Sequence, residues 1–133
     1  TAQGAAPAIR GYTLNGPHFD LQDARGAPVL VHFWATWCPI CALEEDAIDA
    51  IAEDHRVITI AMQSGGPDAV WNYMQKEGLS FPVLVDADGS LARAYGVQGV
   101  PTSFILNPEG DIAFTAVGLS TGLGLRAKLW WAQ

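Results

Sequence analysis

The hydrophobic positions of this chain fall into short continuous runs separated by helix-spaced patterns. The clearest run is Val29–Trp34, which is interrupted only by His32 and follows the turn-forming stretch Arg25–Pro28. Its β-branched and aromatic content favours a strand buried on both faces of a sheet. Similar runs predict further strands over Val57–Met62, Phe81–Val85, Thr102–Leu106 and Ile112–Val117.

Between these runs, apolar residues recur at helical spacing. The residues after Cys41 predict an amphipathic helix with an acidic outer face. A second helix is predicted over Asp68–Glu77, with Val70, Trp71 and Met74 facing inward. A short helix over Leu91–Tyr95 and a last helix over Leu123–Trp131 complete the pattern. The acidic residues assigned to the outer face of the first helix are Glu44, Glu45, Asp46, Asp49, Glu53 and Asp54.

The order of these elements predicts one domain over residues 9–133. Residues 1–8 contain few large apolar groups, and we expect them to form a mobile leader or linker. The turn signal Asn15-Gly16-Pro17 predicts an N-terminal β-hairpin within Ile9–Leu21. Strands alternating with helices, then a hairpin and a helix, predict an α/β fold with a mixed sheet and helices on both faces, a three-layer α/β/α sandwich.

Composition and charge narrow the classes of function. The chain has 133 residues, of which 50% are hydrophobic and 16% charged, as in a folded globular protein. Its formal net charge of −7 disfavours nucleic acid and anionic lipid as partners. The first residues lack the basic and apolar parts of a signal peptide, and no apolar run approaches the ~18 residues of a membrane span. A monomer is the expected state.

The two cysteines, Cys38 and Cys41, carry the candidate chemistry. A disulfide between residues this close constrains the unfolded chain weakly and is poorly placed to hold a fold together. At the junction of a buried strand and a helix, the Cys38 sulfur faces unpaired N–H groups that stabilise a thiolate. Pro39 suits the first helical turn, and Cys41 lies one turn inward, where it should be less accessible. Cys38 is therefore expected to exchange with a partner's disulfide and Cys41 to resolve the mixed disulfide, without a cofactor.

Other functions of this segment stay open. Two soft thiolates could hold Cu(I), which would make the chain a metal-binding module. A thiol peroxidase is a third possibility, although the PxxxTxxC pattern that usually surrounds its reactive cysteine is missing. Trp37, next to Cys38, is either a core aromatic residue or an exposed platform on which flexible substrates dock.

At WATWCPIC the chain resembles the thioredoxin superfamily, and more narrowly the TlpA/ResA/DsbE-like group of extracytoplasmic thiol–disulfide oxidoreductases. The resemblance covers Ala27–Val117 with motifs in family order: VHFWATWCPIC, an extra helix near Asp68–Glu77, FPVLVD and YGVQGVPTSFILNPEGDI. The CPIC segment together with His32 is most similar to the suppressor-for-copper-sensitivity protein D branch of this group.

The resemblance implies a thioredoxin-like fold with an extra helix and assigns residues to the site. Trp37, Pro39 and Ile40 would complete the active-site loop around the two cysteines. Val100-Pro101 would be the family's cis-proline pair, followed by Thr102, and the Val100 backbone would pair with an extended substrate segment. The resemblance implies no cofactor and no metal, only the redox-active pair Cys38 and Cys41.

Two further residues are candidates for proton transfer. His32 occupies the strand position that holds a buried Asp in thioredoxin. It is either a satisfied core residue or an acceptor of the Cys41 proton through water, a step that an imidazole would place near neutral pH. Glu44 matches a family Glu position, but a solvated helix face explains an acidic residue there equally well.

The resemblance also implies a cellular setting. Members of the group act in the bacterial periplasm on protein thiols and disulfides, commonly with an N-terminal membrane tether that these residues do not include. The overall pattern favours a reductant of the copper-tolerance type, supplied with electrons by a DsbD-like membrane partner. A disulfide-forming oxidant and a cytochrome c maturation thioredoxin are the alternatives within this class.

Overall fold

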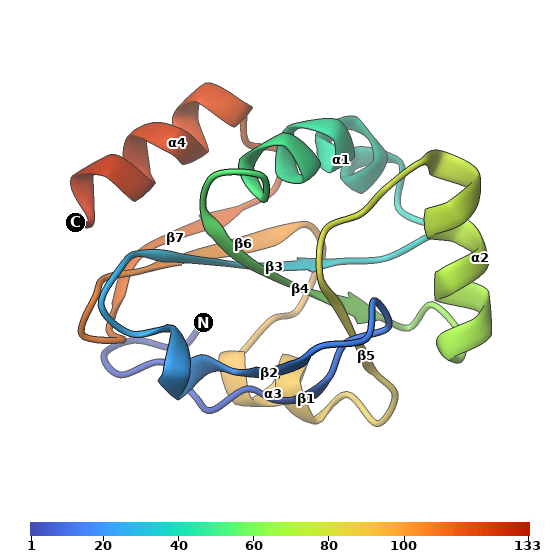
Figure 1. Ribbon diagram of the computed structural model, residues 1–133, viewed down its shortest axis with the longest axis horizontal. Coiled ribbons are helices and arrows are strands. Elements are labelled where there is room, and N and C mark those ends of the chain that lie inside the picture. The colour runs from blue at the N-terminus through green and yellow to red at the C-terminus, as the bar shows by residue number, and fades with distance from the viewer.

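The computed structural model describes residues 1–133, which are built around a five-stranded mixed sheet with strand order β5-β4-β3-β6-β7 (Figure 1). β3 pairs in parallel with β4, and β4 with β5, whereas β6 and β7 run antiparallel. The strands are β3 (Val29–Trp34), β4 (Arg56–Met62), β5 (Val83–Asp86), β6 (Thr102–Leu106) and β7 (Ile112–Val117). The mixed sheet predicted from the hydrophobic runs is therefore confirmed.

Four α-helices cover the two faces of this sheet. They are α1 (Pro39–Ile51), α2 (Pro67–Glu77), α3 (Ser90–Tyr95) and α4 (Gly122–Trp131). Buried residues of α1, α2 and α4 pack into one apolar cluster and those of α3 into another, with the sheet between them. Figure 1 shows α1 and α4 above the sheet and α3 below it. The three-layer α/β/α sandwich is confirmed, with α2 as the extra helix.

The central position of β3 follows from its side chains, all of which are buried. Successive side chains of a strand point to opposite faces of the sheet. Leu30 and Trp34 accordingly join the cluster of α1, while Val31 and Phe33 join the cluster of α3. A strand that is apolar on both faces can be satisfied only in the middle of such a sandwich.

The N-terminal hairpin is also confirmed. β1 (Arg10–Tyr12) pairs antiparallel with β2 (His18–Asp20) in a separate two-stranded sheet, and a short 3-10 helix, η1 (Leu21–Ala24), leads to β3.

The first eight residues differ from the mobile leader that their composition predicts. The backbone N–H of Ala2 donates to the Tyr95 carbonyl at 2.9 Å, and the N–H of Ala6 donates to the Gly110 carbonyl at 3.0 Å. Ala5 also forms an isolated β-bridge with Asp111. Backbone hydrogen bonds hold this segment against the domain. Because these bonds use no side chains, a segment of small residues gives no sequence signal for them.

Two expectations about helix faces are wrong. The helical pattern predicts Glu44 and Glu45 on an acidic outer face, yet their exposed fractions are 1% and 6%. Besides the sheet, α2 and the segment before α4 also pack against α1. Glu45 accepts a hydrogen bond from Tyr73 of α2, and Glu44 accepts one from the backbone before α4. Trp71, expected to face inward, is 39% exposed.

No helix in the structure combines the length and apolar character needed to cross a bilayer.

Candidate active site

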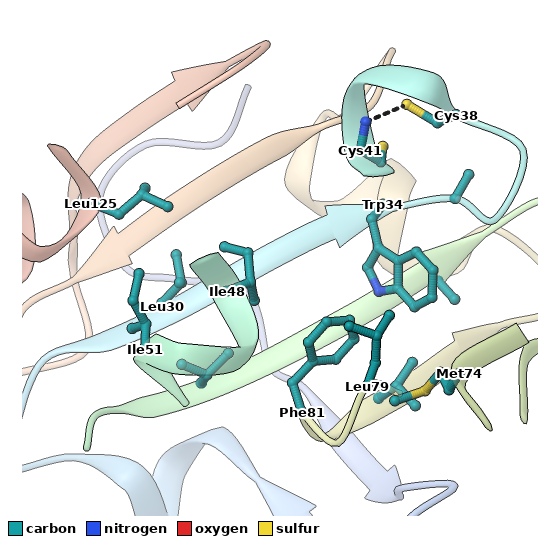
Figure 2. Close-up of a cluster of buried hydrophobic side chains, with 14 of the residues drawn as sticks. Leu30, Trp34, Cys38, Cys41, Ile48, Ile51, Met74, Leu79, Phe81 and Leu125 are labelled. Carbon is teal, nitrogen blue, oxygen red and sulfur yellow. Dashed lines mark hydrogen bonds between the residues drawn. The ribbon is translucent and has the colours of Figure 1, made fainter. Parts of the chain in front are cut away.

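The two cysteines meet at the point where the chain leaves β3 and enters α1. Cys38 is the N-cap residue of α1, and its Sγ accepts a hydrogen bond from the backbone N–H of Cys41 at 3.1 Å (Figure 2). Both cysteines are free thiols, with exposed fractions of 6% for Cys38 and 0% for Cys41. Pro39 occupies the first helical turn, where its missing N–H leaves no hydrogen bond unmade. The dithiol thus has an outer and an inner sulfur, as expected.

The loop before β6 brings a second segment to the dithiol. The Sγ of Cys38 lies 3.8 Å from the Val100 carbonyl oxygen, which accepts its weak hydrogen bond. The Val100–Pro101 peptide bond is cis. The hydroxyl of Thr102 donates to the Gly99 carbonyl at 2.7 Å, which closes this loop on itself. The structure therefore brings Val100 to Cys38 across a long sequence separation, as the resemblance implies.

The mouth of the site is apolar and exposed. The exposed fractions of Trp37 and Ile40 are 58% and 47%, and that of neighbouring Leu43 is 73%. Trp37 is therefore exposed and is not a core aromatic residue. Exposed aromatic and aliphatic side chains beside a reactive sulfur offer non-directional contacts to a polypeptide.

The inner thiol is hard to ionise. Burial raises the pKa of Cys41 to about 12, and the side-chain hydrogen bond with Cys38 and the negative charges of Cys38 and Glu44 act in the same direction. Because a thiolate is the attacking species in disulfide exchange, Cys41 needs a nearby group to accept its proton.

Glu44 is placed to be that group. It follows Cys41 by three residues, a spacing that sets two helical side chains on one face. Its Oε2 accepts a hydrogen bond from the Ser120 backbone N–H at 3.0 Å, whereas its buried Oε1 has no partner among the protein atoms. Burial raises the pKa of this carboxyl group. A carboxyl group whose burial strengthens its hold on a proton, and which has one oxygen free, is a suitable proton acceptor.

The burial of Glu44 also predicts how stability depends on pH. A carboxyl whose folded-state pKa lies above its unfolded value favours folding while it is protonated, and this contribution is lost as pH rises through the folded pKa. We expect Glu44→Gln to be more stable than the wild type at pH 7, because the amide keeps the bond from Ser120 without a buried charge. The advantage should vanish near pH 4. Urea unfolding of both proteins at pH 4 and pH 7 measures it, and equal stability at pH 7 would contradict the buried charge.

His32 is not tuned as its residue type suggests. Its Nδ1 lies 2.7 Å from the Ser103 hydroxyl oxygen within the sheet. Burial lowers the pKa of the ring to about 4, so the imidazole is neutral at neutral pH. The lowered pKa does not favour the alternative in which His32 accepts the Cys41 proton near neutral pH. The geometry fits a satisfied core histidine.

One pair near the site was missed. The Tyr73 hydroxyl of α2 donates to Oε1 of Glu45, a buried carboxyl on α1 that follows Cys41 by four residues. Burial raises the pKa of Glu45, and the Tyr73 hydrogen bond opposes that shift. Helical spacing could have predicted the burial of Glu45, because residues three, four and seven positions after the buried Cys41 lie on the same face of the helix.

Comparison with known proteins agrees with this geometry. Residues 2–115 match the family model described as "AhpC/TSA family". The thiol-disulfide oxidoreductase ResA of Bacillus subtilis is 34% identical over 114 residues, which is 80% of this chain and 62% of the relative. The chain thus spans less than two thirds of that protein.

Solved structures are similar over nearly the whole chain. A thiol:disulfide interchange protein of the thioredoxin family from Chlorobium tepidum has a TM-score of 0.85 and 26% identity, covering 99% of this chain and 97% of that one. An exposed lipoprotein thioredoxin from Streptococcus pneumoniae has a TM-score of 0.83 and 27% identity, covering 94% and 99%. The predicted thioredoxin-like fold is therefore confirmed.

Proposed function

This chain belongs to the AhpC/TSA family within the thioredoxin superfamily, and we propose that it is a thiol–disulfide oxidoreductase acting on protein substrates through Cys38 and Cys41. The observation that supports this most directly is the capped dithiol, with the outer Cys38 sulfur at the helix N-terminus and the sealed Cys41 one turn behind it. Peroxide chemistry is less favoured, because the PxxxTxxC pattern that usually surrounds a peroxidase cysteine is missing from this chain.

The reaction needs only the two thiols. The Cys38 thiolate attacks one sulfur of the partner's disulfide, forms a mixed disulfide and releases the partner's other sulfur as a thiolate, which takes up a proton. Cys41, once deprotonated, attacks the Cys38 sulfur and expels the second partner thiol. The products are the Cys38–Cys41 disulfide and a reduced partner, so two electrons and two protons pass from the protein to its substrate.

Within this reaction we assign the Cys41 proton to Glu44. The group must be close to Cys41, buried enough to hold a proton and free to accept a hydrogen bond, and Glu44 meets each condition. Positioned proton acceptors commonly accelerate such steps by about 10²–10⁴-fold. The Ser120 backbone fixes the carboxyl group without using Oε1.

We further propose that the physiological direction is reduction of the substrate. A dithiol protein becomes more oxidising as its reduced form, with the thiolate, is stabilised. Here α1 contains no Lys or Arg, and it places the buried carboxyls Glu44 and Glu45 on the same helix as both sulfurs. The net charge of the chain is also −7. Burial disfavours the thiolate of the inner cysteine, Cys41, and the charge of Glu44 acts in the same direction, which makes the dithiol readier to give up its electrons.

The substrate would lie along the cis-proline loop. An extended polypeptide can pair with the backbone of Val100, whose carbonyl is next to the Cys38 sulfur. Trp37 and Ile40 would supply apolar contacts around the attacked disulfide. This combination selects an extended segment around a cysteine and requires no particular sequence.

The cellular setting is the remaining part of the proposal. The name of the Streptococcus pneumoniae relative, an exposed lipoprotein, supports an extracytoplasmic location, which in a Gram-negative cell is the periplasm. A reductant there must be reduced again, and the DsbD-like membrane donor implied by the resemblance would do this. Repair of protein thiols oxidised by copper would then give the copper-tolerance role.

A disulfide-linked, self-quenched fluorescent peptide dimer tests the activity, with dithiothreitol as the terminal reductant. The protein is expected to accelerate the rise of fluorescence in catalytic amounts. A rate equal to that of dithiothreitol alone would overturn the proposed function.

A further inference from the structure

The loop between β4 and α2 is hydrogen-bonded to the segment that carries the dithiol. The indole N–H of Trp37 donates to the Gln63 carbonyl at 2.8 Å. The backbone N–H of Thr36 donates to the Ser64 hydroxyl oxygen at 2.9 Å, and that hydroxyl donates in turn to the Met62 carbonyl at 2.8 Å. We call these three hydrogen bonds the clasp. The first two join segments that are 26 and 28 residues apart in the chain, and the third orients the Ser64 hydroxyl within its own loop.

The clasp holds an unusual backbone conformation. Gln63 has φ of +48°, and it is the only residue other than glycine with a positive φ in this chain. Such a conformation is costly for a side chain like that of Gln, and it persists only where surrounding contacts require it. In this conformation the Gln63 carbonyl accepts the hydrogen bond from the Trp37 indole. Conformations of this kind concentrate at functional sites.

The clasp also borders a cleft beside the dithiol. A cleft of about 430 Å³ is lined by Trp37 and Val100 on the side of the cysteines, and by Met62, Gln63, Arg93 and Gln98 elsewhere. Trp37 precedes Cys38 directly, and the Val100 carbonyl contacts the Cys38 sulfur. The cleft is therefore continuous with the site at which a substrate cysteine would be attacked.

An exposed tryptophan without a hydrogen bond would exchange rotamers rapidly. A ring held at its N–H presents one surface, and a substrate that docks on it does not have to order it first. We propose that Gln63 and Ser64 are positioning residues that fix Trp37 as a wall between the dithiol and the cleft, on which the substrate segment flanking the cysteine docks. This inference rests on the proposed function.

The test separates docking from thiol chemistry. With the peptide dimer as substrate, Ser64→Ala is expected to raise KM by roughly two- to tenfold, the effect of losing about one hydrogen bond, and to leave kcat unchanged. The rate at which iodoacetamide alkylates Cys38 should also be unchanged, because this small reagent does not use the wall. Trp37→Phe keeps an aromatic ring but loses the N–H donor, and it should show the same rise in KM.

Ser80→Ala is the matched control. It removes a hydroxyl that lies before β5, at the edge of the sheet opposite the cysteines, and should leave KM at the wild-type value. The inference is overturned if folded Ser64→Ala and Trp37→Phe both keep the wild-type KM, or if alkylation and kcat fall together with no change in KM. A wild-type protein that does not reduce the peptide at all would instead refute the proposed function, and this inference with it.

Discussion

Cys38→Ser is expected to abolish catalysed reduction of the peptide dimer, leaving the rate of dithiothreitol alone. The outer sulfur forms the first bond with the substrate, and a serine hydroxyl at the same position cannot attack a disulfide under these conditions. The serine oxygen can still accept the N-cap hydrogen bond from Cys41, so the fold should be retained.

Cys41→Ser is expected to fail at the second step. Cys38 remains able to attack, but without dithiothreitol no second thiol expels the product, so the mixed disulfide accumulates and migrates as a covalent adduct on a non-reducing gel. The double variant should form no adduct. Wild-type turnover in Cys38→Ser, or adducts in the double variant, would show that the exchange does not pass through these sulfurs.

The second large effect concerns the core beneath the site. Trp34 has an exposed fraction of 1% and packs edge-on against Phe81, with ring centroids 5.5 Å apart, and against Tyr73 at 5.8 Å. Figure 2 shows its ring between the dithiol and Phe81. Trp34→Ala is expected to lower the free energy of unfolding by about 3–5 kcal/mol, the usual cost of emptying so large a buried volume. For a domain whose total stability is of order 5–15 kcal/mol, this approaches unfolding.

Trp34→Phe is the matched variant. It keeps most of the ring contacts and removes the buried indole nitrogen, which has no hydrogen-bond partner in the protein. Its cost should therefore be clearly smaller than that of Trp34→Ala. Urea unfolding monitored by circular dichroism measures both. Equal losses in the two variants would mean that Trp34 does not stabilise the protein by filling this volume.

The sequence could predict the sheet and the dithiol because their signals are local. Val29–Trp34 is apolar at nearly every position, and only a central strand satisfies such a run. The two cysteines likewise stand where a strand run ends and a helical pattern starts, so the N-cap position of Cys38 followed from the pattern alone.

The features that the sequence did not predict depend on contacts between segments that are distant in the chain. Glu44 and Glu45 looked solvated because charge on a helix usually is, and the α2 and α4 segments that cover them are far away in the chain. The same holds for Ala2 and Ala6, whose backbones pair with remote carbonyls. The positive φ of Gln63 has no sequence signal, because it reflects a hydrogen bond made by another loop.

The proposed direction of electron flow is tested most directly by the redox equilibrium of the Cys38–Cys41 pair in glutathione buffers. The fluorescence of Trp34 and Trp37, which neighbour the sulfurs, would report the fraction of disulfide. A reductant predicts a potential of roughly −230 to −270 mV, in the range of glutaredoxins and thioredoxin. A value of about −120 to −180 mV, the range of disulfide-forming oxidants and isomerases, would contradict the proposed reductant.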